Sequence, residues 1–302
     1  MAERSAVPGA RRPGGGRAKR GPARRRGPLE AAGRASAGTA PGAARAIPLI
    51  VVGAAGRMGQ AVVQAANSAP DLSLKGLVDL AANLRAQGGV WSAKLETLAR
   101  KGDVVVEFSS PEGCREAARI CAAAGAALVS GTTGLSSEDE DAVREAARSI
   151  PILRASNFSL GVAALRRALA ETLPYLPGWD IEIVERHHRG KADSPSGTAL
   201  TLARDAARIR GLPASGTLRF GRDGRLGPRP ADEIGVHSVR GGTWVGDHAV
   251  LIAGVGEWIE LRHVAQDRLA FAHGALAAAK WIAGVGSPGI YTIEDVLEPG
   301  TG

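Results

Sequence analysis

Cysteine is nearly absent from this chain of 302 residues, which contains only Cys114 and Cys121. The two lie seven residues apart in a stretch that we predict to be helical, so their Cα atoms should be ~10 Å apart, too far for a disulfide. We therefore expect reduced thiols and a cytoplasmic protein. Cysteine and histidine also do not cluster with the spacing of metal ligands, so no metal site is predicted.

Long apolar runs are missing as well. No stretch approaches the ~20 apolar residues that a membrane-spanning helix needs. Apolar residues make up 44% of the chain and charged residues 23%, which is usual for a soluble globular protein. The length is sufficient for two domains, and no membrane partner is expected.

Acidic residues are scarce in residues 1–46, which hold eleven Lys and Arg against two Glu. This segment has a net charge of +9. Because the whole chain has a net charge of +8, the remaining 256 residues sum to −1. Because it consists mostly of Gly, Pro, Ala and Arg, we predict a disordered basic tail. Two interpretations of this tail stay open. It is either a dispensable extension or the product of an upstream start codon, or it is a targeting or RNA-binding arm. The near-neutral body is not expected to bind nucleic acid.

Strand-like and helical stretches alternate from residue 47 to residue 155. Strands are expected at 47–52, 74–78, 104–108, 127–130 and 152–155, and helices at 60–68, 93–100, 111–125 and 138–148. Such an alternation indicates an α/β fold with a Rossmann-type, doubly wound parallel sheet.

The pattern changes after residue 158, which predicts a smaller α+β domain with a mixed or antiparallel sheet. A helix is expected at 162–173, and strands at 180–185, 233–239, 243–253 and 258–263. A last helix at 271–283 is expected to return to the first domain. The expected division is a dinucleotide-binding domain of residues 47–158 and 269–302, and a substrate-binding domain of residues 159–268.

The motif Gly53-x-x-Gly56-x-x-Gly59 lies between the first predicted strand and the first predicted helix. Glycines there let the backbone approach a pyrophosphate, and the free N–H groups of the helix start face its negative charge. Asp79 ends the second strand 26 residues after Gly53, where its carboxylate can accept hydrogen bonds from the adenine ribose. These features together predict a dinucleotide site.

Asp79 also bears on the choice of cofactor, because a carboxylate repels the 2′-phosphate of NADPH. Residue 80 is Leu80 rather than an arginine. We therefore expect NADH or dual use as the cofactor, with Arg57 and Arg85 as the nearby cations that can offset the repulsion.

Residues 185–198, with the sequence ERHHRGKADSPSGT, carry the densest group of chemically active side chains. Four cationic or protonatable side chains follow a predicted strand within five residues: His187, His188, Arg189 and Lys191. Histidine has an ordinary pKa of about 6.5, which suits proton donation near neutral pH. The alternative is that the two histidines have only a structural role and cap the end of the strand at the surface. The two histidines can share a pocket only if the strand has ended, because neighbouring residues of a strand face opposite sides.

A helix is expected to begin directly after this group, with Pro195 in its first position and Ser194 or Asp193 as N-cap. Its body is predicted at residues 199–210. The free N–H groups of the first turn, together with hydroxyl groups and Lys191, would form a receptor for a small carboxylate. This receptor is expected to comprise Ser196, Gly197 and Thr198.

The sequence resembles the 4-hydroxy-tetrahydrodipicolinate reductase (dihydrodipicolinate reductase) family in six segments that occur in the family's order. They are GAAGRMG (53–59), FSSPEG (108–113), VSGTTG (129–134), ASNFSLG (155–161), ERHHRGKADSPSGTA (185–199) and the stretch near 268–274. The resemblance covers essentially everything after residue 46. It implies an NAD(P)H-dependent oxidoreductase that acts on a CH–CH bond in lysine and diaminopimelate biosynthesis. It also implies a homotetramer assembled through the sheet of the second domain.

The resemblance assigns roles to individual residues. His187 would be the proton donor and Lys191 a second donor or charge stabiliser, while His188, Gly197 and Thr198 would hold a small dicarboxylate substrate. The residues implied for the cofactor are Gly53, Ala54, Ala55, Gly56, Arg57, Met58, Asp79, Gly131, Thr132, Thr133, Ala155, Ser156, Asn157 and Phe158. Two departures from the family pattern are the missing arginine after Asp79 and a serine in place of the usual threonine in FSSPEG.

Two other interpretations stay open at this point. One is another Rossmann-type reductase with a substrate domain, such as an amino-acid or oxo-acid dehydrogenase, which would not need the HHRGK and SGT arrangement. The other is a dinucleotide-sensing protein without catalytic activity.

Overall fold

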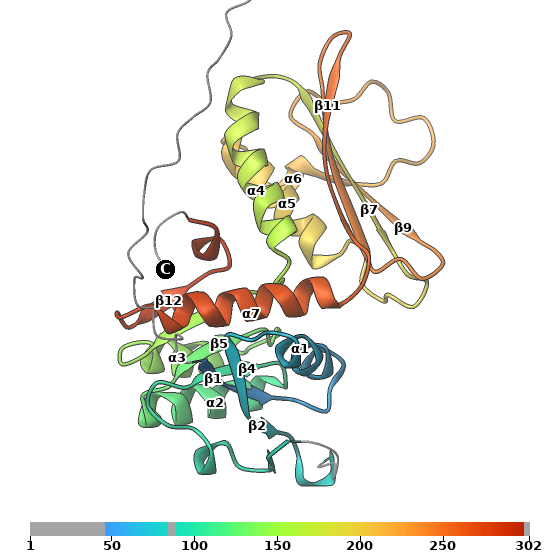
Figure 1. Ribbon diagram of the computed structural model, residues 1–302. Coiled ribbons are helices and arrows are strands. Elements are labelled where there is room, and N and C mark those ends of the chain that lie inside the picture. Colours follow the sequence, from blue (N-terminus) through green and yellow to red (C-terminus); the bar gives the residue numbers. More distant parts are fainter. Residues whose placement is uncertain (1–45, 84–88, 299–302) are drawn as a thin grey trace, which may run out of the picture. The chain divides into compact units, whose positions relative to one another are not determined.

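The computed structural model describes residues 46–83 and 89–298, which form two β-sheets with helices packed against them (Figure 1). Residues 1–45 of the predicted basic tail, and Arg85, lie outside the described residues. Within the described ranges, no helix is both long enough and apolar enough to cross a membrane. The division into two domains at residues 159 and 268 stays a prediction.

The first sheet has seven strands in the order β12-β6-β5-β4-β1-β2-β3, and every neighbouring pair is parallel. The strands are β1 (Ile47–Val52), β2 (Leu72–Val78), β3 (Trp91–Ser92), β4 (Val104–Glu107), β5 (Ala127–Ser130), β6 (Pro151–Arg154) and β12 (Gly289–Tyr291). The chain winds outward in both directions from the β1–β4 pair, which confirms the predicted doubly wound sheet. A dinucleotide binds at such a switch point, beyond the carboxyl ends of the strands.

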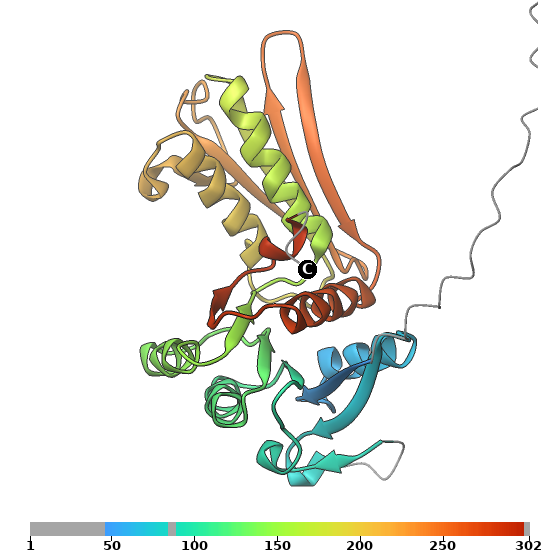
Figure 2. The same ribbon diagram turned by 60° about the vertical axis from the view of Figure 1, so that its left-hand side comes forward.

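Helices cover both faces of this sheet (Figure 2). Leu49 and Val51 of β1 pack with α1 (Arg57–Asn67) and α7 (Leu269–Ala283) on one face. Ile50 and Val52 pack with α2 (Pro111–Ala124) and α3 (Ser137–Ala146) on the other. Burial on both faces explains why the strands are continuous apolar runs. The contacts of α7 with β4, β5 and β6 confirm that the last helix returns to the first sheet.

Both cysteines lie in α2, where they are buried and unpaired, so the prediction of free thiols is confirmed. Burial and the nearby Glu107 raise the pKa of Cys114 to about 11, so this thiol stays protonated at neutral pH.

The prediction of a helix at residues 93–100 was wrong. Only a short 3₁₀ turn, η2 (Leu95–Thr97), forms there. The side chain of Ser92 accepts a hydrogen bond from the backbone N–H of Lys94, and that of Thr97 donates to the Lys94 carbonyl. These local bonds compete with the backbone bonds of an α-helix.

The second sheet has five strands in the order β11-β10-β7-β9-β8. They are β7 (Asp180–His187), β8 (Leu218–Phe220), β9 (Ile234–Arg240), β10 (Gly246–Ala253) and β11 (Trp258–Ala265). Strand β10 is antiparallel to β7 and β11, whereas β7–β9 and β8–β9 are parallel, which confirms the predicted mixed sheet. Helices α4 (Leu160–Thr172) and α5 (Gly197–Ile209) supply the apolar side chains that cover it, and α6 (Ala214–Thr217) is short.

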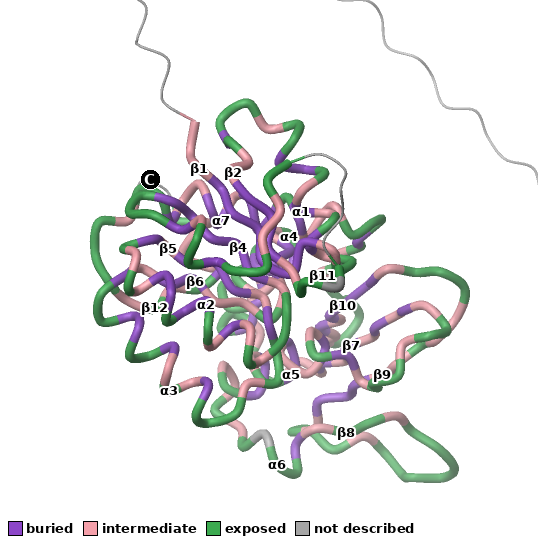
Figure 3. Tube along the Cα trace, turned by 90° about the horizontal axis from the view of Figure 1, so that it is seen from below, coloured by how far each residue is buried: buried purple, intermediate pink, exposed green. Residues whose placement is uncertain are grey.

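Strand β7 determines which face carries the chemically active residues. Its burial alternates strictly, and Ile181 and Ile183 lie in the core. The strand runs two residues beyond its predicted end, so Glu185 and His187 continue this buried row. Among the described residues, Figure 3 shows buried residues gathered in the strands of the first sheet and exposed residues in the connecting loops. The core face of β7 therefore ends in a carboxylate and an imidazole.

Candidate active site

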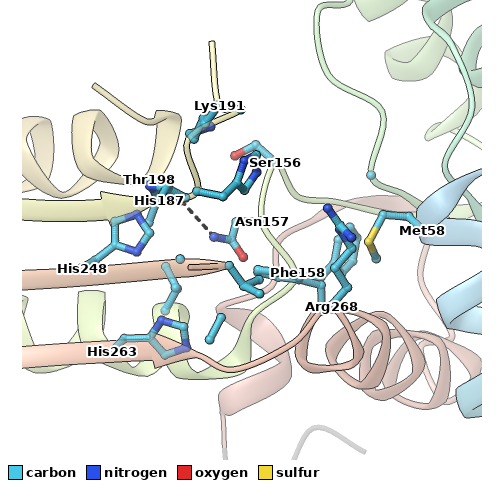
Figure 4. A pocket seen from close by; sticks show the side chains of 18 of the residues that line it. Met58, Ser156, Asn157, Phe158, His187, Lys191, Thr198, His248, His263 and Arg268 are labelled. Carbon is cyan, nitrogen blue, oxygen red and sulfur yellow. Dashed lines mark hydrogen bonds between the residues drawn. The ribbon is translucent and has the colours of Figure 1, made fainter. Parts of the chain in front are cut away.

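A cavity of about 860 Å³ brings together the ends of both sheets. His187 from β7 and Lys191 from the following loop line it together with Met58, which belongs to the glycine-rich segment after β1. In Figure 4 the three histidines His187, His248 and His263 lie opposite Met58. The other predicted site residues that line this cavity are His188, Thr198, Gly131, Thr133, Ser156, Asn157 and Phe158.

A second cavity, of about 690 Å³, lies beyond β1 and β2. Four predicted cofactor residues line it: Gly53, Ala55, Gly56 and Asp79. Phe108 lines both cavities, so the two are neighbours. A dinucleotide is long enough to need both, with its pyrophosphate near the switch point of the sheet.

Gly53 fits the close backbone approach expected for a nucleotide-binding turn. Its φ of +76° lies in the left-handed region, and a Cβ there would lie 2.1 Å from the carbonyl oxygen of Phe108. A Cβ on Gly131 would lie 2.0 Å from the Phe108 ring. Neither position therefore has room for a side chain beside Phe108, which lines both cavities. This arrangement fits a bound dinucleotide.

Asp79 holds the glycine-rich turn in place. One of its carboxylate oxygens accepts a hydrogen bond of 2.8 Å from the backbone N–H of Ala55, and the other accepts bonds from Leu80 and Asn83. The carboxylate thus links the end of β2 to the loop after β1, at the rim of the second cavity.

Six predicted site residues line neither of these cavities. They are Ala54, Arg57, Thr132, Ala155, Ser196 and Gly197. Ala54, Thr132 and Ser196 are buried, whereas Arg57 and Gly197 are exposed. The structure therefore does not bring these six into contact with the two cavities, and two of them act on the site through other residues.

Thr132 is one of these two, and it reveals a residue that the sequence analysis missed. Its hydroxyl donates to Glu107, a fully buried carboxylate at the end of β4. Glu107 also accepts bonds from the backbone N–H and the hydroxyl of Ser109, and from the hydroxyl of Ser130. One carboxylate thereby fixes the loops after β4 and β5 to each other. The available signal was an acidic residue that ends an otherwise apolar strand.

Ser196 is the second, and it corrects the predicted start of the helix. Neither Ser194 nor Asp193 is the N-cap: helix α5 begins at Gly197, and the hydroxyl of Ser196 accepts the capping bond from Ala199. The backbone N–H of Ser196 is not free but donates to Glu185 over 3.1 Å. Helix α5 therefore starts two residues later than predicted, and the N–H group of Ser196 is taken by this carboxylate.

The loop after β6 joins the cofactor residues to the start of α5. The side-chain amide of Asn157 donates to the hydroxyl of Thr198 over 2.9 Å, as Figure 4 shows by a dashed line. Its oxygen accepts from the backbone N–H of Ser159. Ser159 in turn bonds to His263 of β11 over 3.0 Å. These hydrogen bonds therefore join the loop after β6 of the first sheet to α5 and to β11 of the second sheet.

His187 is 8% exposed and its Nδ1 lies 2.5 Å from a carboxylate oxygen of Glu185. Burial lowers the pKa of His187, and the nearby charges of Lys191 and Arg240 lower it further, while Glu185 acts in the opposite direction. The net direction is downward, so the imidazole is mainly neutral at pH 7. His188 follows the strand end, with its N–H bonded to Trp244, so both histidines reach the same cavity.

His248 is a further residue that the sequence analysis missed. It lies on β10, is 4% exposed, and its ring centroid is 5.1 Å from that of His187. Its Nε2 bonds to the hydroxyl of Ser196 over 3.1 Å. Burial lowers the pKa of His248 to about 4. His263 and Arg268 also line the cavity and were not predicted, because the fold brings them there from β11 and from the start of α7, far from residues 185–198 in the sequence.

The electrostatic character of the two cavities is opposite. None of the described residues that line the first cavity is Asp or Glu, while three are permanent cations: Arg189, Lys191 and Arg268. The second cavity is lined by Asp79, Glu96 and Glu116, with Lys94 as its cation among the described residues. The first therefore suits an anion, and the second suits uncharged hydroxyl groups. Among the described residues no group of side chains is arranged to hold a metal ion.

Comparisons with known proteins agree with this geometry. Residues 47–158 match the model of the dihydrodipicolinate reductase N-terminus, and residues 161–297 match that of the C-terminus. The chain belongs to the dihydrodipicolinate reductase family. The predicted family, the NAD(P)H-dependent reductase class and the NADH or NADPH cofactor are thereby confirmed.

Individual relatives cover most of the chain. The 4-hydroxy-tetrahydrodipicolinate reductase of Thermomicrobium roseum is 45% identical over 257 residues, which are 82% of this chain and 98% of that protein. That of Nitratiruptor sp. is 46% identical over 214 residues, 71% of this chain and 84% of that protein. The dipicolinate-bound dihydrodipicolinate reductase from Paenisporosarcina sp. TG-14 superposes with a TM-score of 0.68 at 24% identity, over 83% of this chain and all of that one, which confirms the fold.

Proposed function

We propose that this chain reduces 4-hydroxy-tetrahydrodipicolinate to tetrahydrodipicolinate, with loss of water, in the biosynthesis of diaminopimelate and lysine. The main support is that one cavity is lined by His187, Lys191 and Met58 of the glycine-rich segment. The described residues that line this cavity include cations but no carboxylate. A small dicarboxylate is the ligand that such a lining favours. The name of the relatives and the dipicolinate in the Paenisporosarcina protein support the same substrate class.

In the proposed mechanism, the substrate carboxylates are held by Lys191, His188 and the start of α5 near Thr198. Gly131, Thr133 and Asn157 would hold a reduced nicotinamide, which would supply the hydride for C4 of the conjugated imine that remains after water leaves. His187 then gives a proton to the ring nitrogen, while Lys191 offsets the negative charge that develops there. Binding at fixed positions supplies proximity, and closure about residues near Ser159 and Arg268 would exclude water.

The test is an absorbance assay at the reduced-nicotinamide band, with freshly made synthase product and each cofactor in turn. We expect oxidation of NADH that depends on the synthase product. No oxidation of either cofactor above the rate without the chain would overturn the proposal.

The pH dependence follows from the environment of His187. An imidazole that donates a proton must be charged, and in the free enzyme burial keeps the pKa of His187 below 6.5. The two carboxylates of the substrate should raise it. We therefore expect kcat/KM to fall with rising pH through a pKa below 6.5, and kcat to fall only at higher pH. Measurements of kcat and kcat/KM across the neutral pH range check this. If both quantities fell at the same pH, the prediction would be contradicted.

We also propose that the chain uses NADH, or both NADH and NADPH, and that Asp79 disfavours NADPH. Asp79 lines the adenosine side of the second cavity and repels a 2′-phosphate. Asp79→Asn should raise the ratio of kcat/KM with NADPH to that with NADH by ~10-fold, since it removes one like charge close to the phosphate. Glu116→Gln, which removes a charge at the same cavity from α2, is the matched control. An equal change in both variants would show that bulk charge, and not Asp79, sets the preference.

Finally, we propose a cytoplasmic homotetramer assembled through the second sheet. Trp258, Ile259 and Val264 of β11 are large apolar side chains that are 60%, 37% and 51% exposed. A mass measurement in solution tests the assembly.

A further inference from the structure

Glu185 is a fully buried charged group next to the first cavity, which it does not line. Its side chain is 0% exposed, and it accepts four hydrogen bonds. Two come from the guanidinium of Arg240, over 2.8 and 2.7 Å, one from His187 Nδ1 over 2.5 Å and one from the N–H of Ser196 over 3.1 Å. Burial raises the pKa of Glu185, but these bonds outweigh it and lower the pKa to about 2. Glu185 is therefore an ionised carboxylate at all working pH values.

This carboxylate determines which nitrogen of His187 carries the proton. An ionised carboxylate can only accept, so Nδ1 must carry a hydrogen and Nε2 is left as the nitrogen that can exchange protons. Nε2 lies on the side of Gly246, where an added Cβ would come within 3.3 Å of it. Gly246 also lines the cavity, so the exchanging nitrogen lies beside its wall.

Arg240 holds the carboxylate and the next loop together. It binds both oxygens of Glu185, and its second terminal nitrogen also donates to the carbonyl of Asp193 over 2.7 Å. Through Ser196, the same carboxylate is bonded to the residue that begins α5. The imidazole and the start of the substrate-binding helix are thus fixed to one group, although neither Glu185 nor Arg240 lines the cavity.

We propose that Glu185, held by Arg240, is a positioning residue for the reaction. It keeps His187 in the tautomer with Nδ1 protonated, and its negative charge supports the protonated imidazole when substrate binds. This inference rests on the proposed role of His187 as proton donor. It adds two residues, Glu185 and Arg240, that act through His187 and through the start of α5.

The first experiment compares Glu185→Gln with the wild-type protein. The amide keeps the size of the side chain but removes the charge and can donate to Nδ1, which stabilises the wrong tautomer. We expect kcat to fall ~100-fold with an unchanged dissociation constant for NADH. Because the carboxylate raises the pKa of His187, the basic limb of kcat should also move to lower pH. A loss of kcat without this movement would overturn the positioning role.

A double-mutant cycle with His187→Gln separates positioning from structural support. If Glu185 acts through the imidazole, Glu185→Gln should cause no further loss of kcat in the His187→Gln background. An equal loss in both backgrounds would show that the carboxylate only stabilises the fold. If Glu185→Gln does not fold because Arg240 is left unpaired, Glu185→Gln/Arg240→Gln removes both charges and serves the same comparison.

The wild-type protein supplies a readout that needs no variant. The ¹⁵N chemical shifts of the His187 ring, recorded at alkaline pH without ligand, should show a protonated Nδ1. A protonated Nε2 would overturn the inference even in an active enzyme. If His187→Gln keeps full turnover while Nδ1 is protonated, the proposed proton donor fails and the positioning geometry stands, so the two failures are distinguishable.

Discussion

Replacing His187 by Gln should lower kcat by ~10²–10⁴-fold, the usual contribution of a positioned proton donor. Gln cannot become charged, and its amide cannot pass a proton to a ring nitrogen. The substrate carboxylates still meet Lys191 and the start of α5, so the KM for substrate should change little. The dissociation constant for NADH should also be unchanged, because Gly53, Gly56 and Asp79 line the other cavity.

His273→Gln is the matched control for this variant. His273 is an exposed residue of α7 and does not line the cavity, so its replacement should leave turnover unchanged. Steady-state rates and NADH fluorescence titration on both variants give the comparison. Equal losses of turnover and NADH affinity in His187→Gln would show that the residue supports the fold and not the proton transfer.

The fold was predictable because its signals are local. The run at β1, the glycine-rich turn and the Pro111 start of α2 each reflect the conformation of the residues that carry them. The strands β3, β8 and β12 were not predicted, because they have two or three residues each and form only by pairing with a neighbour. Pairing between segments that are distant in sequence produces no periodic pattern of apolar residues.

The chemical site was predictable where its residues are adjacent in sequence and not where the fold brings them together. His187, His188 and Lys191 lie within one segment, and their number and type predicted a proton donor beside an anion. His248, His263 and Arg240 lie on other strands of the same sheet. Strand pairing alone puts β10 and β9 on either side of β7, so the sequence gives no sign of these partners.

The corrected start of α5 has the same cause. Pro195 and the preceding polar residues satisfy the local rules for a helix start. The tertiary bond from Ser196 to Glu185 then moved the N-cap to Ser196. A buried carboxylate that needs donors outweighs a local preference worth about 1 kcal/mol.

Replacing Lys191 by Met should lower kcat/KM for the substrate by ~100-fold, because a direct charge contact with a carboxylate in a partly desolvated site is worth several kcal/mol. The ammonium of Lys191 donates to both carboxylate oxygens of Asp193, over 2.7 and 2.9 Å. The substrate must therefore compete with Asp193 for this cation. We expect the loss to appear in both KM and kcat, since Lys191 also offsets charge that develops during the reaction.

Asp193→Asn is the matched variant, and its expected effect has the opposite sign. The amide no longer competes for Lys191, so the KM for substrate should fall while kcat stays near the wild-type value. Steady-state kinetics on Lys191→Met, Asp193→Asn and the double variant check both directions. If the two substitutions act only by changing the net charge of the loop, they should shift the KM for substrate in opposite directions. The two shifts should then add in the double variant. If the substrate binds Lys191 itself, Asp193→Asn should bring no gain once Lys191 is Met, because the competition it relieves no longer exists.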